Sequence, residues 1–229
     1  RILLPKDYLR FQLTGEFASD VSDASGTALF DVAHRRWSQT MIESLHLDAA
    51  ALPAVHESQE LSGKISASAA AATGLREGTP LVAGAGDQAA SAVGNGIVSA
   101  GPVSCTLGTS GVVFSYLSQP NYDAAGRVHT FCHAVRDSWH VMGVTQGAGL
   151  SLQWFRAQLA PASNYDSLME EASAAPAGSQ GLFWLPYLRG ERTPHLDAKG
   201  RGGWVGLTAK HTLADLTRAW IEGVCYSQK

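Results

Sequence analysis

The sequence predicts an α/β protein built in two parts, and a change of pattern near residue 96 carries this prediction. Before it, the pattern is mostly helical, with one strand-like run ahead of Asp87. After Gly94-Asn95-Gly96, paired strand-like runs come first and are followed by helix, strand and helix. Such an order favours a mixed sheet covered by helices. We place a boundary near Val98, so that residues 1–98 form one domain and residues 99–229 the next.

Composition and charge exclude several classes of protein. The 229 residues can bury a core, and the formal net charge of −3 comes from acids and bases mixed along the chain, with no basic block for nucleic acid. No apolar run approaches the roughly 20 residues of a membrane span, and the first residues do not resemble a signal peptide. Three widely spaced cysteines fit neither a disulfide framework nor a metal motif. We expect a reduced, cytoplasmic protein without nucleic-acid or membrane partners.

Helices in the first part are predicted from end signals and apolar spacing. One is expected over Pro5–Thr14, with proline in its first turn, a stop at Gly15, and Tyr8, Leu9 and Leu13 on one stripe. Further helices are expected over Trp37–Leu47, Ser66–Thr73 and Asp87–Gly94, a buried strand over Leu81–Ala83, and a linker over Leu52–Gly63. Asp20 and Asp23 are interpreted as caps of turns and helix starts rather than as a cation site, because their carboxylates can bond local N–H groups.

The second part is predicted to begin with strands and end with a long helix. Strands are expected over Val103–Leu107, Val112–Leu117, Arg127–His133, Trp139–Val144 and Leu182–Leu185. Helices are expected after Gly149 with Leu152, Phe155 and Leu159 on one face, over Tyr165–Ala174, and over Leu213–Tyr226 with Leu216, Trp220 and Val224 inward. The chain also stops within what resembles a helix.

Two short stretches carry candidate chemistry. In Val82 to Ala90 a Gly-Ala-Gly turn, where glycine permits close backbone approach, leads to Asp87 at a helix start. Asp87 could take a proton from a substrate, or it could only cap the helix. In Leu107 to Gly111, two hydroxyl residues stand between glycines. This stretch offers donors for a phosphate, or it is only a hairpin turn.

Four segments, in this order, resemble the FGGY family of carbohydrate kinases. They are Leu3-Leu4-Pro5-Lys6-Asp7-Tyr8-Leu9-Arg10, Gly86-Asp87-Gln88-Ala89-Ala90, Leu107-Gly108-Thr109-Ser110-Gly111, and the run from Leu185 to His195, Leu-Pro-Tyr-Leu-Arg-Gly-Glu-Arg-Thr-Pro-His. The resemblance covers essentially the whole chain and is strongest toward members that phosphorylate D-xylulose. It implies an actin-like, ribonuclease-H-like ATPase fold, with parts of two domains flanking a cleft. It also implies a central fragment, because we find neither the family's Asp-x-Gly-Thr phosphate loop nor its glycine-rich adenine loop.

The resemblance assigns the sugar-binding and catalytic roles to adjacent residues. Asp87 matches the family's catalytic aspartate, which also contacts the sugar. Gln88 matches a residue that bonds a sugar hydroxyl, as an amide can do both as donor and as acceptor.

Nucleotide-binding roles are likewise implied by the resemblance. Gly108, Thr109, Ser110 and Gly111 match the family's second phosphate loop. Gly149 and Gln153 match positions that approach the nucleotide in related glycerol kinases. The alternative is that Gly149 is a helix-entry turn and Gln153 a surface residue.

The implied reaction is ATP-dependent phosphorylation of the terminal hydroxyl of D-xylulose. Mg²⁺ is expected to arrive with the nucleotide, held mostly by phosphates and water. His129, His133 and His140 are interpreted as core or surface residues rather than zinc ligands, so no protein metal site is expected.

The expected partners are a sugar, a nucleotide and a second copy of the chain in a homodimer. One alternative is a sister kinase acting on glycerol, ribulose or gluconate. Another is a catalytically silent sugar-binding relative, against which the retained Asp87 and loop hydroxyls argue.

Overall fold

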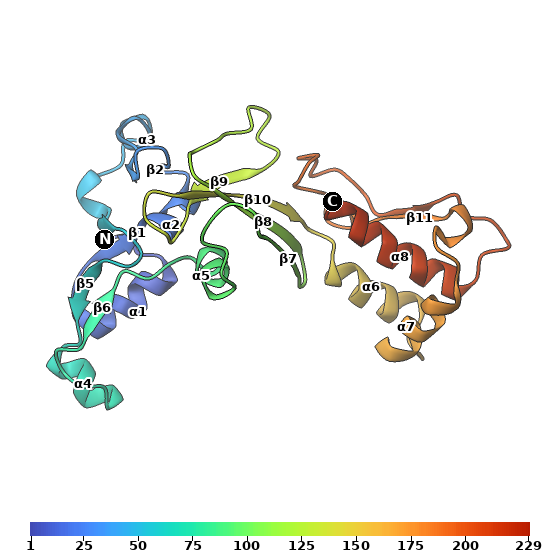
Figure 1. Cartoon of the computed structure of the whole chain (residues 1–229), viewed down its shortest axis with the longest axis horizontal. Helices are drawn as coiled ribbons and strands as arrows, with labels where there is room; N and C mark the ends of the chain where they lie inside the picture. The colour runs from blue at the N-terminus through green and yellow to red at the C-terminus, as the bar shows by residue number, and fades with distance from the viewer. The chain divides into compact units, whose positions relative to one another are not determined.

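The computed structural model describes residues 1–229, and the contacts of the chain divide it into two compact units (Figure 1). The first comprises Arg1–Val103, Phe114–Tyr122 and Thr130–Val141, and the second comprises Ser104–Val113, Asp123–His129 and Met142–Lys229. This division is discontinuous. The continuous domains predicted from the sequence, residues 1–98 and 99–229, therefore stay a prediction.

The first unit contains five helices and three small two-stranded sheets. The helices are α1 (Pro5–Thr14), α2 (Val21–Ala24), α3 (Gln39–Ser44), α4 (Ala67–Thr73) and α5 (Asp87–Gly94). The strands are β1 (Ala18–Asp20), β2 (Phe30–Asp31), β3 (Arg36–Trp37), β4 (Ala54–His56), β5 (Leu61–Lys64) and β6 (Pro80–Val82). β1 pairs with β4 in parallel, whereas β2 pairs with β3 and β5 with β6 in antiparallel fashion.

Several expectations for this unit are wrong in detail. The stretch expected to be a linker, residues 52–63, contains β4 and most of β5. The helix expected from Trp37 begins at Gln39, because Trp37 pairs with Phe30 in a strand and Ser38 caps the helix. The strand before Asp87 is only partly buried: Val82 is exposed and Ala83 alone is fully covered.

Helix α1 has the predicted bounds but buries the opposite face. Tyr8 and Leu9 are exposed, whereas Asp7 and Arg10 are buried. The guanidinium of Arg10 donates to the backbone oxygens of Glu16, Ala18 and Ser62 at 2.8–2.9 Å. The inward face of α1 is therefore occupied by Asp7 and Arg10 and not by the expected apolar stripe. Burial of these two charges is tolerated because each is paired with a partner.

The predicted strand pairs form a four-stranded sheet with the order β7–β8–β10–β9. These strands are β7 (Val103–Leu107), β8 (Gly111–Leu117), β9 (His129–Cys132) and β10 (Trp139–Thr145). Within the first unit, the Phe114 ring of β8 stacks on His140 with ring centroids 4.3 Å apart, and His133 packs edge-on against both. Both histidines are buried. Burial lowers the pKa of His140 from 6.5 to about 3, and the nearby His133 adds to this effect.

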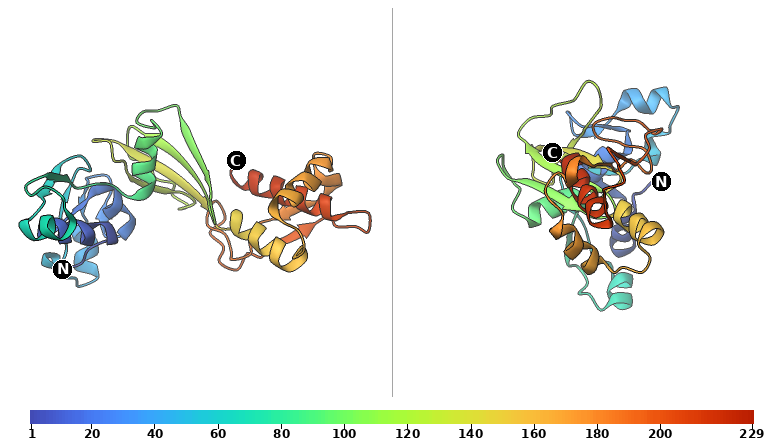
Figure 2. Two further views of the ribbon diagram at one scale, coloured as in Figure 1. Left: turned by 90° about the horizontal axis from the view of Figure 1, so that it is seen from below. Right: turned by 90° about the vertical axis from the view of Figure 1, so that its right-hand side faces the viewer.

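The second unit is built around its last helix. It contains α6 (Gly149–Leu159), α7 (Tyr165–Ala174), β11 (Phe183–Leu185), β12 (Gly203–Val205) and α8 (Leu213–Ser227). α8 contacts α7 and β11 (Figure 2) and packs Trp220 and Val224 against Leu182 and Trp184. This inward face was predicted from the sequence. Leu159, however, is exposed, and α8 ends at Ser227 before the last residue.

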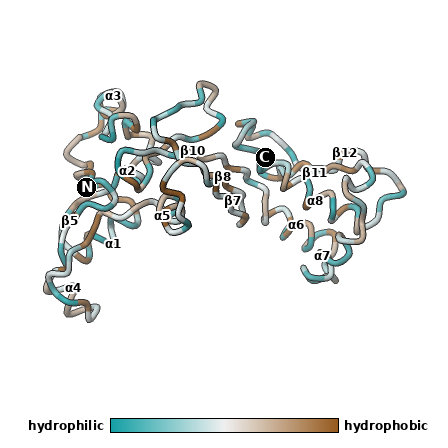
Figure 3. Tube along the Cα trace, viewed as in Figure 1, coloured by the Kyte–Doolittle hydropathy of each residue, from teal (hydrophilic) through white to brown (hydrophobic).

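Hydrophobic and hydrophilic stretches alternate along the trace (Figure 3). None of the helices has the length and apolar character needed to span a membrane.

Candidate active site

Asp87 stands at the first position of α5 and is not the N-cap residue of that helix. Gly86 is the N-cap residue, so the capping alternative is wrong. Asp87 is exposed; one of its oxygens accepts the N–H of Gln88 at 2.7 Å and the other has no hydrogen bond within the chain. The Gln88 amide, half-buried beside it, also makes no side-chain hydrogen bond. These groups are therefore available to a ligand.

The turn that carries Asp87 is held by the segment between β4 and β5. The N–H groups of Ala83 and Gly84 donate to the carbonyl oxygens of Glu60 and Ser58 at 2.9 and 3.0 Å. Gly84 has φ +82°, a left-handed conformation that favours glycine. The sequence signal of a Gly-Ala-Gly turn was therefore read correctly.

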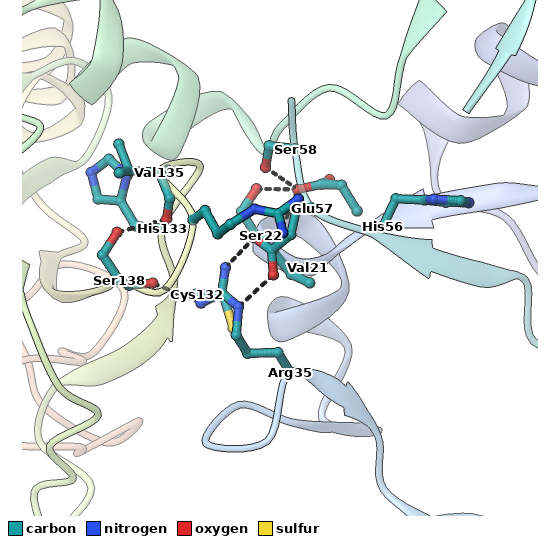
Figure 4. Close-up of polar contacts among 12 residues, drawn as sticks. Val21, Ser22, Arg35, His56, Glu57, Ser58, Cys132, His133, Val135 and Ser138 are labelled. Atoms are coloured by element: carbon teal, nitrogen blue, oxygen red, sulfur yellow. Dashed lines mark hydrogen bonds and ion pairs between the residues drawn. The ribbon is translucent and has the colours of Figure 1, made fainter. Parts of the chain in front are cut away.

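An ion pair fixes that supporting segment in turn. Two nitrogens of the Arg35 guanidinium, Nε and Nη2, donate to the Glu57 carboxylate at 2.7 and 2.6 Å (Figure 4). Arg35 also donates to the carbonyl oxygen of Ser138 at 2.8 Å. Such a bidentate pair adds geometric specificity to charge attraction. It ties the residues next to Ser58 to two other parts of the first unit.

A buried ionic cluster lies against the same turn and was missed in the sequence. The Lys6 ammonium is 2.5 Å from Asp7 Oδ1, 2.9 Å from Asp20 Oδ1 and 3.9 Å from Asp23 Oδ2. It also donates to the carbonyl oxygen of Ala83 at 3.4 Å. Asp20 caps α2, as its interpretation as a cap expected, but it is also the ionic partner of Lys6.

The cluster shifts the pKa of two of its members. Burial opposes the charge on Lys6, but Asp20 and Asp7 outweigh it and raise the Lys6 pKa. Burial also raises the pKa of Asp23; Lys6 opposes the rise, and the carboxylates of Asp20, Asp7 and Asp87 add to it.

The candidate phosphate loop is docked on the start of α6 in the second unit. The N–H groups of Gly149 and Leu150 donate to the carbonyl oxygens of Gly108 and Thr109, at 2.8 and 3.0 Å. A Cβ on Gly149 would lie 2.6 Å from the Gly108 oxygen, so only glycine fits there. The structure thus joins two regions that are far apart in the sequence.

The remaining loop atoms differ in what they contact. The hydroxyls of Thr109 and Ser110 make no hydrogen bond within the chain, so they remain open to phosphate oxygens or water. Gly111 is buried, and a Cβ there would collide with the Gln228 side chain. Gln153 lies one helical turn beyond Gly149 on α6 and is exposed. Its exposure fits both a nucleotide contact and a plain surface residue.

The Gly-Glu-Arg-Thr-Pro-His segment supports the entry to α6, a role that sequence reasoning did not assign. Buried Glu191 accepts hydrogen bonds from the Thr145 hydroxyl at 2.5 Å and the Gln146 N–H at 3.0 Å. Thr193 exchanges backbone and side-chain hydrogen bonds with Val144, both at 3.0 Å. The end of β10 and the residues leading into α6 are therefore held by this segment.

The residues offer no cage for a metal ion. No group of three His, Cys, Asp or Glu side chains anywhere in residues 1–229 could hold one. In the acidic cluster the Lys6 ammonium lies between the carboxylates of Asp7 and Asp20.

The comparisons with known proteins agree on one family. Models of the N-terminal and C-terminal domains of the FGGY family of carbohydrate kinases match residues 1–94 and 103–229. The chain is 44% identical to the xylulose kinase of Escherichia coli and 41% identical to that of Bacillus subtilis, covering 99% and 98% of itself and 46% and 45% of those proteins. A solved structure described as a "xyloylose kinase" from Brucella ovis aligns with TM-score 0.92 and 40% identity over 99% of this chain and 46% of that one.

The chain therefore belongs to the FGGY family of carbohydrate kinases and has their actin-like α/β ATPase fold. It spans slightly under half the length of the curated relatives that it matches.

Proposed function

We propose that the chain forms part of a kinase that transfers the γ-phosphoryl group of ATP to the terminal hydroxyl of D-xylulose. The observation that carries this proposal is the exposed Asp87 carboxylate at the head of α5, with one oxygen free of partners in the chain. The choice of sugar is supported by the xylulose kinases among the relatives, which are between 36% and 44% identical.

Asp87 acts as the base that accepts the proton of the attacking hydroxyl. A positioned carboxylate in this role commonly contributes about 10²–10⁴-fold to the rate. Gln88, which follows it, binds a neighbouring sugar hydroxyl through its unpaired amide. Base and sugar contact are then held by the same turn of α5.

The loop from Gly108 to Gly111 contacts the phosphates of ATP. Its two hydroxyls have no partner in the chain, and its backbone approaches the start of α6 so closely that Gly149 has no room for a side chain. Gln153 contributes a further nucleotide contact from the next turn of that helix. Phosphoryl transfer depends mainly on such positioning and charge stabilisation.

Mg²⁺ enters bound to ATP and neutralises charge on the phosphates. The chain itself supplies no side-chain cage for it. We further propose that the intact kinase is cytoplasmic and forms a homodimer. The mass of the intact protein in solution tests the oligomeric state.

The decisive experiment replaces Asp87 by Asn in a full-length kinase carrying this segment. The amide keeps the shape and reach of the carboxylate but cannot accept the proton, so we expect kcat to fall by about 10²-fold or more while sugar affinity changes only a few-fold. Turnover near that of the unmodified enzyme would remove Asp87 from the mechanism.

A substrate screen separates the remaining alternatives. D-xylulose, ribulose, glycerol and gluconate are offered to the same protein, and phosphorylated product is measured. Preference for another sugar identifies a sister kinase, and sugar binding without any product identifies a silent relative.

A further inference from the structure

We propose that Ser22 is a positioning residue for Asp87, and that Asp20 fixes the Ser22 hydroxyl in the orientation this requires. The inference rests on the proposed role of Asp87 and adds residues that no sequence pattern assigned. It concerns the first unit alone.

The Ser22 hydroxyl links the buried cluster to the head of α5. It donates to Asp20 Oδ2 at 2.5 Å and accepts the N–H of Gly86 at 3.0 Å. Gly86 is the N-cap residue of α5, so its N–H precedes Asp87 by one residue. A hydroxyl can donate only one hydrogen bond. Because the Ser22 hydroxyl donates to Asp20, it can only accept a hydrogen bond from the N–H of Gly86. Asp20 therefore decides that the Ser22 hydroxyl is the acceptor in its hydrogen bond with Gly86.

Asp20 is held firmly enough to serve as this reference point. It is fully buried and also accepts the N–H of Ser22 and the hydroxyl of Ser58, each at 2.8 Å. The Lys6 ammonium, 2.9 Å away, balances its charge. Ser22 and Ser58 belong to the polar cluster drawn in Figure 4. A charged group with this many donors in a buried site has little freedom to rotate.

The neighbouring contacts of the turn do not replace the Ser22 bond. The N–H groups of Ala83 and Gly84 donate to backbone carbonyl oxygens, but the N–H of Gly86 has only the Ser22 hydroxyl; the Gly86 carbonyl oxygen accepts the N–H of Ala90 within α5. On its other side Gly86 lies against Asp23, because a Cβ at Gly86 would be 3.4 Å from Asp23 Oδ1. Loss of the hydroxyl thus leaves the N–H next to Asp87 without a partner while the start of the turn stays anchored.

Ser25 provides a matched control on the same short stretch. It is as buried as Ser22, each with 5% of its surface exposed. Its hydroxyl likewise donates once, to the Val21 carbonyl oxygen at 2.7 Å, and accepts one backbone N–H, that of Cys132 at 3.0 Å. Ser25→Ala therefore removes one donated and one accepted hydrogen bond without touching Gly86, although its donated bond goes to a neutral carbonyl oxygen and not to a carboxylate.

The test compares Ser22→Ala, Ser22→Thr and Ser25→Ala in a full-length kinase carrying this segment. Hydrogen exchange resolved at single amides reports on the bonds directly. We expect Ser22→Ala to speed exchange at Gly86 by about fivefold or more and to leave Cys132 unchanged, with the reverse pattern for Ser25→Ala. We expect kcat to fall about tenfold in Ser22→Ala, with sugar KM within about twofold. Ser22→Thr keeps a hydroxyl and restores both readouts.

Two results would overturn the inference: unchanged exchange at Gly86 in Ser22→Ala, or an equal loss of kcat in Ser25→Ala. The exchange measurement needs no turnover. An Asp87→Asn variant with full activity would remove Asp87 from the mechanism and with it the catalytic purpose of the Ser22 bond, whereas the exchange rate of the Gly86 amide would still report separately whether Ser22 holds the turn.

Discussion

Replacement of Gly149 by Ala tests whether the contact between the candidate phosphate loop and α6 supports nucleotide binding. The added Cβ would lie 2.6 Å from the Gly108 carbonyl oxygen. Relief of this contact to an ordinary separation of about 3.4 Å moves loop and helix apart by about 0.8 Å. The same movement takes the bonds from Gly149 and Leu150, now 2.8 and 3.0 Å, beyond hydrogen-bond range.

The two lost hydrogen bonds set the size of the effect. At about 1 kcal/mol each, the second unit loses about 2 kcal/mol of stability. A displacement of nearly 1 Å at a binding loop can cost about 10²-fold in rate, so we expect the efficiency with ATP, kcat/KM, to fall by about tenfold to a hundredfold. The sugar KM should stay within about twofold, since the residues proposed to bind the sugar, Asp87 and Gln88, belong to the first unit.

Steady-state kinetics in ATP and in D-xylulose, together with thermal melting, measure these effects in a full-length kinase. Gly203→Ala is the control, because a Cβ at Gly203 meets no atom within 4 Å and lies in the same unit. If Gly149→Ala keeps both its ATP kinetics and its melting temperature, loop docking has no part in nucleotide binding.

Three further predictions concern other parts of the molecule. Thr109→Val deletes a hydroxyl that has no partner in the chain, so ATP KM or kcat should worsen at constant melting temperature; unchanged kinetics would show that the hydroxyl does not contact ATP. Because burial keeps His140 neutral down to about pH 3 while the unfolded chain gains a proton near pH 6.5, stability is lost as pH falls. The loss from pH 7 to pH 5 is about 2 kcal/mol. His140→Phe should abolish this part of the acid sensitivity in urea unfolding at the two pH values, and equal sensitivity would contradict the reasoning. Residues 1–229 expressed alone should self-associate and show no xylulose-dependent ATP consumption, because Tyr8 and Leu9 are exposed and the matching relatives are about twice as long; a soluble, active monomer would refute this.

Local chemistry explains which elements could be predicted from the sequence. Helix α1 begins at a proline and ends before Gly15, which has φ +78° as a helix-ending glycine should. α8 shows apolar residues at helical spacing, and they face inward as expected. The strands β4 and β5 lacked such signals, because three or four residues are too few to establish an alternating pattern.

The parts of the candidate site that escaped prediction depend on partners far apart in the chain. Asp20 was identified as a cap, since its cap partners are two and three residues away. Its bond to Ser58 joins residues 38 positions apart, and nothing in the sequence links them. Glu191 likewise binds Thr145 across 46 positions. Asp87 and the loop hydroxyls could be proposed from the sequence because their chemistry lies within a few consecutive residues, and their roles stay predictions.

Arg10 joins two small sheets that share no ladder of backbone hydrogen bonds. Its guanidinium donates to the main-chain oxygens of Ala18 in β1 and Ser62 in β5, and also to the Ser62 hydroxyl at 3.2 Å. Since every residue type presents a main-chain oxygen, the bond to position 18 does not depend on the side chain there. Position 10 requires arginine, because the planar guanidinium of arginine reaches several acceptors at once, whereas lysine has a single nitrogen. The junction therefore depends on the side chain of one residue, Arg10, to which the two strands contribute mainly main-chain oxygens.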